Sequence, residues 1–310
     1  MSTTGVLKAA IVGAGVFGTF HARKYAAAEG VELMAIVDPD PAQAGKLAEE
    51  LGVDAVSDLA TVAEELDLVT VACPAVFHYQ VAKQALEAGC NVLVEKPIAL
   101  KIDHADKLIA LADAKGLVLQ VGHQERFVFD AFGLLSRDVA PTKISATRAG
   151  PFTGRAMDVS VVMDLMIHDL DLIHQVVPGA LKNVEADAKT IHGEHPDEVT
   201  ARLSFGDGAE VTLHASRIAD VRDRNMSIEY PDGVISIDFI NRKIENTTSV
   251  ELGDLFGDDQ PAVMADPLGF AVSKFIDSAR TKTTPVITGQ CGRRALDTAL
   301  KIHDAANAAA

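Results

Sequence analysis

The sequence predicts an α/β protein of two domains, a doubly wound parallel sheet followed by an α+β domain with a largely antiparallel open sheet. From residue 7 to residue 121, short β-branched runs alternate with amphipathic segments of helical length, which is typical of βαβ units. After Gly122, longer strands follow one another with a tight turn at 231–233, which is typical of antiparallel strands. A length of 310 residues also favours two domains, which we place at residues 1–122 and 123–310.

The predicted strands of the first domain are short and almost entirely apolar, as expected for strands that are buried on both faces of a parallel sheet. They lie at Leu7–Val12, Glu32–Val37, Leu68–Ala72, Val92–Val94 and Leu117–Val121. The segments between them predict a helix that ends near Glu29 and helices at Pro41–Leu51, Val76–Ala88 and Asp103–Ala114. Right-handed crossovers would place these helices on both faces of the sheet.

The second domain is predicted to combine longer strands with three helices. Its strands lie at Lys182–His192, Glu198–Phe205, Glu210–Ile218, Asn225–Tyr230 and Gly233–Ile240. Its helices lie at Asp158–Val177, Pro267–Ala279 and Gly292–Ala309, the last of them able to pack back on the first domain. The exposed face expected for an antiparallel sheet favours a homodimer or homotetramer.

Composition excludes several classes of partner. The 28 Lys and Arg residues against 44 Asp and Glu residues give a net charge of −16, which disfavours nucleic acid and anionic membrane surfaces. The sequence has no uninterrupted apolar stretch long enough to span a bilayer. Three widely spaced cysteines, Cys73, Cys90 and Cys291, fit neither a disulfide framework nor a zinc site. We therefore expect no metal, and a reducing, cytoplasmic location.

A glycine-rich turn follows the first predicted strand and opens the first helix. In the run Gly13-Ala14-Gly15-Val16-Phe17-Gly18, the first glycine permits the tight turn, the second lets the backbone approach a pyrophosphate, and the third allows close packing. Asp38 ends the second strand, 20 residues after Gly18, where a carboxylate can bind the adenosine ribose and repel a 2′-phosphate. The alternative is a tight turn without a ligand. We predict a Rossmann domain that binds NAD rather than NADP through Gly13, Gly15, Val16, Phe17, Gly18 and Asp38.

Two further strands end in polar residues at the same predicted edge of the sheet. One strand ends at Cys73-Pro74 and the other at Glu95-Lys96-Pro97. Both strand ends border the crevice where open α/β sheets bind ligands. Partial burial of Lys96 beside a cationic nicotinamide would favour the neutral amine. On residue type alone, Lys96 could equally be an exposed residue at a strand end.

These motifs resemble those of the glucose-fructose oxidoreductase, inositol dehydrogenase and rhizopine catabolism (Gfo/Idh/MocA) family. The resemblance rests on the runs Cys73–His78, Ala85–Gly89, Val92–Pro97, Val121–His123, Arg126-Phe127 and Pro285–Gly289 and on Asp164, His168 and Asp171. It implies an NAD(P)-dependent dehydrogenase in which Lys96 is catalytic and contacts the substrate. It also implies that Cys73, Pro74, His78, Glu95 and Lys96 contact the cofactor. Ala75 and Val128-Phe129 stand where many relatives have Asn and Asn-Pro.

Asp164, His168 and Asp171 lie at helical spacing in the segment predicted for Asp158–Val177, which places them on one face. A histidine there can take a hydroxyl proton while hydride leaves the same carbon, and a nearby carboxylate can orient it. A structural histidine and a metal-binding pair are the alternatives, although no third ligand is evident. The resemblance implies catalytic and substrate-binding roles for Asp164 and His168. Asp171 could be a cap or a supporting group.

Two arginines indicate the substrate class. Arg148 and Arg155 flank Gly150-Pro151-Phe152, and guanidinium groups suit phosphate, so we predict that both bind substrate. Surface charge is the alternative. The run from Val162 to Asp169 resembles the branch of UDP-N-acetylglucosamine 3-dehydrogenases, which implies oxidation of a UDP-sugar at C3. A free sugar or inositol is the alternative substrate, and an NAD-loaded sensor or scaffold without turnover is the alternative of another class.

Overall fold

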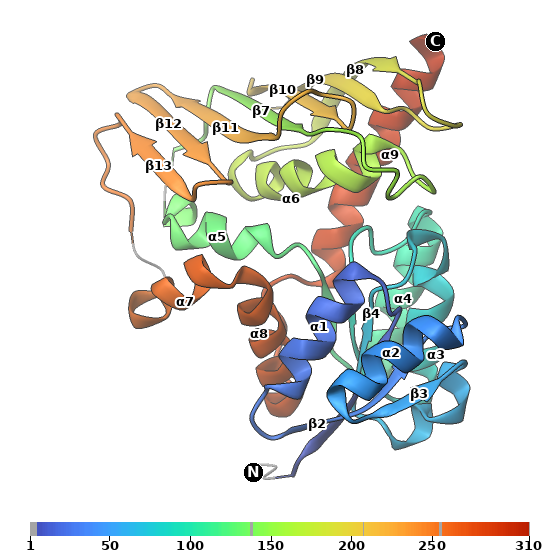
Figure 1. The fold of residues 1–310 in the computed structure, drawn as a ribbon. Helices are drawn as coiled ribbons and strands as arrows, with labels where there is room; N and C mark the ends of the chain where they lie inside the picture. Colours follow the sequence, from blue (N-terminus) through green and yellow to red (C-terminus); the bar gives the residue numbers. More distant parts are fainter. Residues whose placement is uncertain (1–4, 137–138, 207, 254–255, 310) are drawn as a thin grey trace. The chain divides into compact units, whose positions relative to one another are not determined.

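The computed structural model describes residues 5–136, 139–206, 208–253 and 256–309. Contacts divide the chain into two compact units, Met1–Gln124 with Asp266–Arg293 and Glu125–Ala265 with Arg294–Ala310. Figure 1 labels their elements. Within the described ranges, no helix is long and apolar enough to cross a membrane.

The first unit contains a six-stranded parallel sheet with the order β3-β2-β1-β4-β5-β6. Its strands are β1 Leu7–Val12, β2 Val31–Val37, β3 Asp54–Val56, β4 Leu68–Val71, β5 Asn91–Val94 and β6 Leu119–Val121. Val12 pairs with Val37 and with Val71, so β1, β2 and β4 end level at one edge. Because the strand order reverses beside β1, this carboxyl edge is where the fold forms a ligand crevice.

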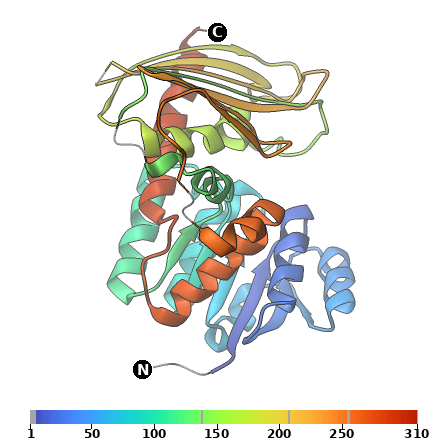
Figure 2. The same cartoon turned by 90° about the vertical axis from the view of Figure 1, so that its left-hand side faces the viewer.

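Helices cover both faces of this sheet, as the sequence predicts (Figure 2). They are α1 Val16–Ala26, α2 Pro41–Leu51, α3 His78–Ala88 and α4 Ile102–Lys115. α1 contacts α2, and α3 contacts α4, and right-handed crossovers put the two pairs on opposite faces. Local sequence fixes the ends of α2: the Asp40 carboxylate accepts the Ala42 N–H at 2.9 Å, and Gly52 ends the helix with a φ of 70°.

The chain returns to the first unit after the second sheet. α8, Pro267–Thr281, contacts α1, and its Phe275 joins the buried core that contains Tyr25 and Ile36. The division between the units falls within α9, Gly289–Ala309, after Arg293. The predicted boundary at Gly122 places α8 in the second domain, whereas its contacts place it in the first unit. The reason is that the buried apolar face of α8 packs against α1 and the core of the parallel sheet.

The second unit contains a seven-stranded mixed sheet with the order β13-β12-β11-β7-β10-β9-β8. Its strands are β7 Lys143–Ala149, β8 Leu181–Lys189, β9 Glu198–Phe205, β10 Glu210–Ser216, β11 Asp223–Tyr230, β12 Gly233–Asp238 and β13 Lys243–Asn246. β7 and β10 run parallel, and every other neighbouring pair is antiparallel. The predicted largely antiparallel sheet is confirmed.

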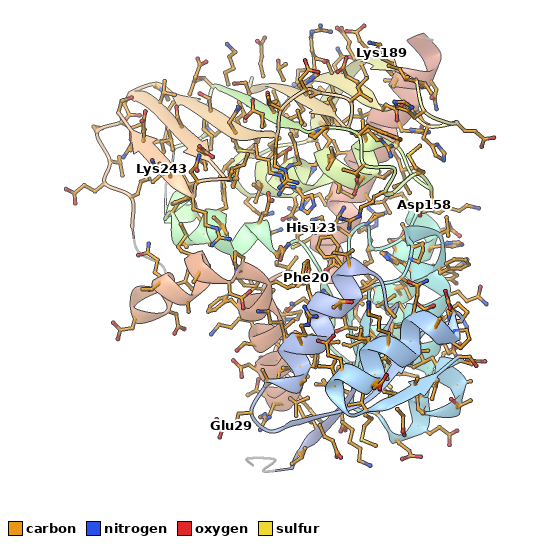
Figure 3. All side chains as sticks on the ribbon, viewed as in Figure 1. Phe20, Glu29, His123, Asp158, Lys189 and Lys243 are labelled. Carbon is orange, nitrogen blue, oxygen red and sulfur yellow. The ribbon has the colours of Figure 1, made fainter. Side chains whose placement is uncertain are left out.

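One face of this sheet packs on helices, and strand alternation separates the two faces. The helices of this unit are α5 Glu125–Ala131, α6 Ile167–Val176, α7 Gln260–Ala265 and the later part of α9. Buried positions such as Val211 and Leu213 alternate along β10 with exposed or half-buried polar ones. Lys189 and Lys243 lie exposed on the strands β8 and β13 (Figure 3).

The helix predicted for Asp158–Val177 is shorter and irregular at its start. A π-helical segment, Val162–Met166, precedes α6, and the Ile167 N–H reaches back to the Val162 carbonyl. This segment contacts β10 and β7 through buried side chains including Val162, Met163 and Met166. One-turn π segments inside helices often coincide with functional sites.

Candidate active site and cofactor turn

The glycine-rich turn between β1 and α1 leaves room for a ligand on one side. Gly13 has a φ of 101°, and a Cβ there would lie 2.6 Å from the Cys73 nitrogen. A Cβ on Gly18 would lie 1.7 Å from the Gly13 carbonyl oxygen. A Cβ on Gly15, by contrast, would meet no described atom within 4 Å. Two glycines thus close the turn against protein, and Gly15 faces space that a pyrophosphate would fill.

The start of α1 supplies donors to that space. Gly15 is its N-cap residue, and none of the described side chains caps its first N–H groups. Such N–H groups, together with the helix dipole, favour an anion. Val16 and Phe17 on this turn are 47% and 37% exposed.

Asp38 lies at the end of β2, beside the turn. Its Oδ2 accepts the Ala14 N–H at 2.8 Å, and its Oδ1 accepts the Asp40 N–H at 2.9 Å. Each oxygen of an ionised carboxylate can accept a second hydrogen bond. The carboxylate therefore fixes the turn and retains the capacity to bind a ribose diol. The residues present fit a dinucleotide cofactor.

His78 ties together the turns that follow β4 and β5. Its Nδ1 lies 2.7 Å from the Pro97 carbonyl oxygen, and its Nε2 lies 2.9 Å from the Cys73 carbonyl oxygen. Burial lowers the pKa of His78 despite these two carbonyls. Burial likewise raises the pKa of Cys73 to about 12, so that side chain is a neutral thiol. Pro74, between them, is exposed.

Glu95 is a buried carboxylate directly before Lys96. Its Oε1 lies 2.8 Å from Nε2 of His21, which is itself 1% exposed. Burial alone would raise the pKa of Glu95, but the hydrogen bond and charge of His21, with Lys96 and His78, lower it overall. A Cβ on Gly122 would lie 2.7 Å from the Glu95 carboxyl group, so a glycine there makes room for it.

Lys96 follows β5 at the carboxyl edge of the parallel sheet, where its side chain is partly exposed. The Lys96–Pro97 peptide bond is cis. The structure thus brings Lys96, Glu95, Cys73 and the glycine-rich turn to one edge of one sheet, as the sequence predicts.

Asp164 and His168 lie in the second unit, in the π segment and the first turn of α6. Both are partly exposed, whereas their neighbours Met166 and Ile167 are fully buried. A spacing of four residues keeps both side chains on the same side of the helix. Among the described residues, no cluster of His, Cys, Asp or Glu could hold a metal ion.

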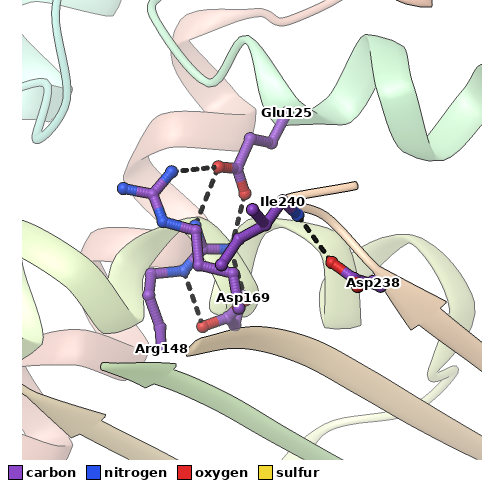
Figure 4. Close-up of polar contacts among 6 residues, drawn as sticks. Glu125, Arg148, Asp169, Asp238 and Ile240 are labelled. Atoms are coloured by element: carbon purple, nitrogen blue, oxygen red, sulfur yellow. Dashed lines mark hydrogen bonds and ion pairs between the residues drawn. The ribbon is translucent and has the colours of Figure 1, made fainter. Parts of the chain in front are cut away.

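Arg148 corrects one prediction. It is 1% exposed and lies in the core of the second unit rather than at a substrate surface. Its guanidinium contacts Glu125 at 2.8 and 2.5 Å and Asp169 at 3.1 and 2.7 Å (Figure 4). Arg224 adds a contact of 3.4 Å to Glu125. The carboxylates of Glu125 and Asp169 thus accept the guanidinium hydrogen bonds that we had predicted for a phosphate.

Asp171, the third residue at this spacing, pairs with an arginine of a neighbouring helix. It is 1% exposed and accepts from Nε of Arg126 on α5 at 2.9 Å. The pair joins α5 to α6 within the second unit.

Sequence reasoning did not find His21, Glu125, Asp169 or Arg224. His21 lies one helical turn after Gly18, and Asp169 lies next to His168, so proximity in sequence was the available signal. Glu125 and Arg224 come from elements far from both, and only the sheet register brings Arg224 beside Arg148.

Arg155 lies on the exposed loop between β7 and the π segment. A hollow of about 390 Å³ elsewhere in the second unit is lined by His174 and Arg294, among others, and by none of the predicted site residues.

Comparison with known proteins shows the family to which the chain belongs. Residues 7–123 match the oxidoreductase family with an NAD-binding Rossmann fold, and residues 136–236 match the GFO/IDH/MocA C-terminal domain. The chain is 32% identical to a UDP-N-acetylglucosamine 3-dehydrogenase of Acidithiobacillus ferrooxidans, over 97% of this chain and 98% of that protein. The chain belongs to the Gfo/Idh/MocA oxidoreductase family. Its first domain is an NAD-binding Rossmann domain, so the predicted family, fold class and cofactor are confirmed.

Solved structures of the family agree with the fold. That of the Acidithiobacillus ferrooxidans enzyme is similar with a TM-score of 0.86 at 31% identity, over 97% of this chain and 98% of that chain. A scyllo-inositol dehydrogenase from Lactobacillus casei, solved with NAD(H) and scyllo-inositol, has a TM-score of 0.82 at 23% identity, over 98% of both chains.

Substituting Gly15 and Gly18 by alanine should separate cofactor binding from folding. Gly15→Ala adds a methyl group to open space, so we expect an unchanged Tm and an NAD Kd at least about tenfold higher, since the methyl displaces a charge-assisted contact. Gly18→Ala forces the methyl into the Gly13 carbonyl, so we expect a lower Tm even without NAD. Calorimetric titration with NAD and thermal unfolding measure the two effects. Tight NAD binding by Gly15→Ala would contradict the assigned pyrophosphate position.

Proposed function

We propose that this protein is an NAD-dependent dehydrogenase of a sugar, with UDP-N-acetylglucosamine oxidised at C3 as its leading substrate. The proposal rests on the position of Lys96. It lies at the edge of the parallel sheet that also holds the NAD-binding turn, and a partly exposed amine there suits a reacting hydroxyl. The similarity over nearly the whole chain to a UDP-N-acetylglucosamine 3-dehydrogenase supports the substrate.

Three side chains carry the chemistry in this proposal. NAD, when bound, accepts the hydride from the carbinol carbon. His168 accepts the hydroxyl proton, Asp164 orients His168 and stabilises its charged form, and Lys96 stabilises the developing alkoxide. The buried Glu95 carboxylate, held by His21, fixes the backbone from which Lys96 projects and balances its positive charge.

Arg155 supports a phosphate-containing substrate, because it is the exposed member of the arginine pair predicted from the sequence. Arg148 no longer supports it. A free sugar or inositol remains the second candidate, since relatives of this chain include a myo-inositol dehydrogenase of Streptomyces leeuwenhoekii at 29% identity over 67% of the chain. A sensor or scaffold without turnover would need neither Lys96 nor His168.

Substrate profiling tests the function directly. NADH formation is followed with UDP-sugars, free sugars and inositols, and the product of each active substrate is reduced with borodeuteride and analysed by mass spectrometry. We expect UDP-N-acetylglucosamine to give the highest kcat/KM and deuterium at C3. Turnover of inositol alone would favour the second candidate, and no turnover of any alcohol would favour the scaffold.

Cofactor preference should follow Asp38. A double variant with Asp38→Ser and Pro39→Arg loses the carboxylate and gains a cation for a 2′-phosphate, so we expect its preference to shift from NAD toward NADP. Because Asp38 also holds the Ala14 N–H, Asp38→Asn serves as a control that keeps an acceptor oxygen without the charge. Calorimetric Kd values for both cofactors measure the shift. Tighter binding of NADP than of NAD by the unmodified protein would refute the assignment.

We also propose a homodimer or homotetramer in the cytoplasm. The open face of the second sheet, where Ser145, Thr147 and His214 are only partly exposed, supports pairing of subunits. The wide sequence spacing of Cys73, Cys90 and Cys291, which fits no disulfide framework, supports a reducing compartment. Light scattering on the purified protein tests the oligomer.

A further inference from the structure

The loop that joins β7 to the π segment is fixed at both ends by the last residue of β10 and by residues that follow it. At its start, the Gly150 N–H donates to the Ser216 carbonyl at 2.9 Å, and the Ala219 N–H donates to the Gly150 carbonyl at 3.1 Å. At its end, the buried Arg217 side chain donates to the carbonyl of Ala156 at 2.8 Å and to that of Val159 at 2.7 Å. Residues 151–155 between these anchors are exposed.

The same arginine organises a second loop, residues 190–197. Its Nε pairs with Oδ1 of the fully buried Asp197 at 3.3 Å. Oδ2 of Asp197 in turn accepts the N–H groups of Ile191 at 2.7 Å and of His192 at 2.6 Å. The Arg217–Asp197 pair is therefore a shared anchor that sets the positions of both loops, and burial protects it from solvent screening.

The two loops meet in an aromatic stack. The rings of Phe152 and His192 lie 3.9 Å apart at an interplanar angle of 24°, while Phe152 is 41% exposed. The exposed fraction leaves part of the Phe152 ring open to a ligand while the His192 ring is stacked against it. A ring held flat by a neighbour on one side is pre-organised to accept a planar group, and pre-organisation lowers the entropy lost on binding.

The loop also continues directly toward the proposed catalytic residues. The Val161 N–H donates to the Pro196 carbonyl at 3.0 Å, so the second loop also fixes the start of the segment that carries Asp164 and His168. Arg155, three residues after Phe152, is exposed on the same anchored stretch. An aromatic platform, a nearby cation and the acid–base helix thus follow one another along a single fixed segment.

We propose that Phe152 and Arg155 form a nucleoside diphosphate subsite, in which the Phe152 ring, supported by His192, stacks on the base and Arg155 binds the diphosphate. The inference deepens the proposed function, because it assigns the part of the chain that would recognise the nucleotide of a UDP-sugar. Stacking suits a base because every base presents a flat π-face, and a guanidinium suits the paired oxygens of a diphosphate. Arg217 and Asp197 are positioning residues for both contacts.

The test uses UDP and uridine as separate probes, titrated by calorimetry into the NAD-loaded protein. Phe152→Ala should raise the Kd of both probes by about 5- to 150-fold, which is the range for loss of one base–aromatic stack. Phe152→Tyr keeps the ring and should stay within about threefold of the original protein. Arg155→Ala should raise the Kd of UDP by about 10-fold or more and leave that of uridine nearly unchanged, because uridine has no phosphate.

Kinetics add a second readout. With UDP-N-acetylglucosamine, Phe152→Ala should raise KM and leave kcat nearly constant, because the base is remote from the reacting carbon. The Kd for NAD and the Tm should not change in any of these variants, since both side chains are exposed.

The outcomes separate this inference from the proposed function. If the original protein oxidises UDP-sugars and Phe152→Ala leaves UDP binding and KM unchanged, the subsite is wrong and the function stands. If UDP binds through Phe152 and no sugar is oxidised, the subsite stands and the function is wrong. If the original protein binds neither UDP nor uridine, the subsite is overturned.

Discussion

Replacing Lys96 by alanine is expected to lower kcat by at least about 10²-fold while the Kd for NAD stays within a few-fold, since an acid–base or charge-stabilising group contributes about 10²- to 10⁴-fold. His168→Ala should lose kcat by a similar factor. In both variants the fold is retained, because each side chain is partly exposed. Stopped-flow NADH formation and calorimetric NAD binding measure the two quantities.

A double variant distinguishes shared from separate roles. If Lys96 and His168 both act on the hydroxyl oxygen in one step, removing both should cost much less than the product of the single losses. Lys101→Ala is the matched control, because Lys101 is an exposed lysine close in sequence with no part in the proposed chemistry. A Lys96→Ala enzyme with near-normal kcat across the pH range would overturn the mechanism but not the NAD-binding fold.

Replacing Arg148 by methionine should destabilise the second unit by about 3–5 kcal/mol, which is typical when one partner of a buried ion pair is removed. Arg148 is almost fully buried, and its guanidinium is the cation that Glu125 and Asp169 share (Figure 4). Methionine fills similar volume but leaves two carboxylates in a poorly hydrated site. Chemical denaturation at neutral pH measures the loss of the free energy of unfolding.

The stability that Arg148→Met loses should depend on pH. Burial raises the pKa of Asp169 even though the charge of Arg148 opposes the rise. A carboxyl group whose pKa is higher in the folded state than in the unfolded state costs stability above its folded pKa and gains a proton as pH falls through that value. Without Arg148 the pKa of Asp169 rises further. The deficit of Arg148→Met is therefore expected to be largest at neutral and alkaline pH and to shrink in mild acid.

The control for this prediction is a solvent-exposed pair. Arg202→Met removes the partner of Asp187 on the surface of the second sheet, where water and salt screen both charges. We expect a much smaller and nearly pH-independent change there. Equal losses for Arg148→Met and Arg202→Met would show that the buried network does not stabilise the fold as proposed.

Local pattern was enough to predict the first sheet and its cofactor turn. Strands such as Leu68–Val71 are buried and almost entirely apolar, and the turn that opens at Gly13 needs glycine because its φ is positive. The acid at Asp38 and the lysine at Lys96 each follow an apolar strand, so the parallel topology alone places them at one edge.

Weaker local signals were missed or misplaced. The strand β7, Lys143–Ala149, was not predicted, because its buried positions include two alanines and an arginine and only one large apolar residue, Ile144. The helix α8 has a clear amphipathic pattern, but the pattern does not say which sheet its apolar face covers. The π segment was predicted as part of a regular helix, and in the structure it packs against β10 and β7.

Spacing within single elements was enough to predict the two-sheet architecture and the NAD-binding turn, and it singled out Lys96, Asp164 and His168, to which we assign the acid–base chemistry. Which partner each charged side chain meets became clear from the three-dimensional packing. Arg148 and Arg155 look equivalent in sequence, yet one lies in the core between Glu125 and Asp169 and the other on an exposed loop. A charge can be buried only where distant strands and helices supply its partners, and no local sequence pattern encodes those contacts.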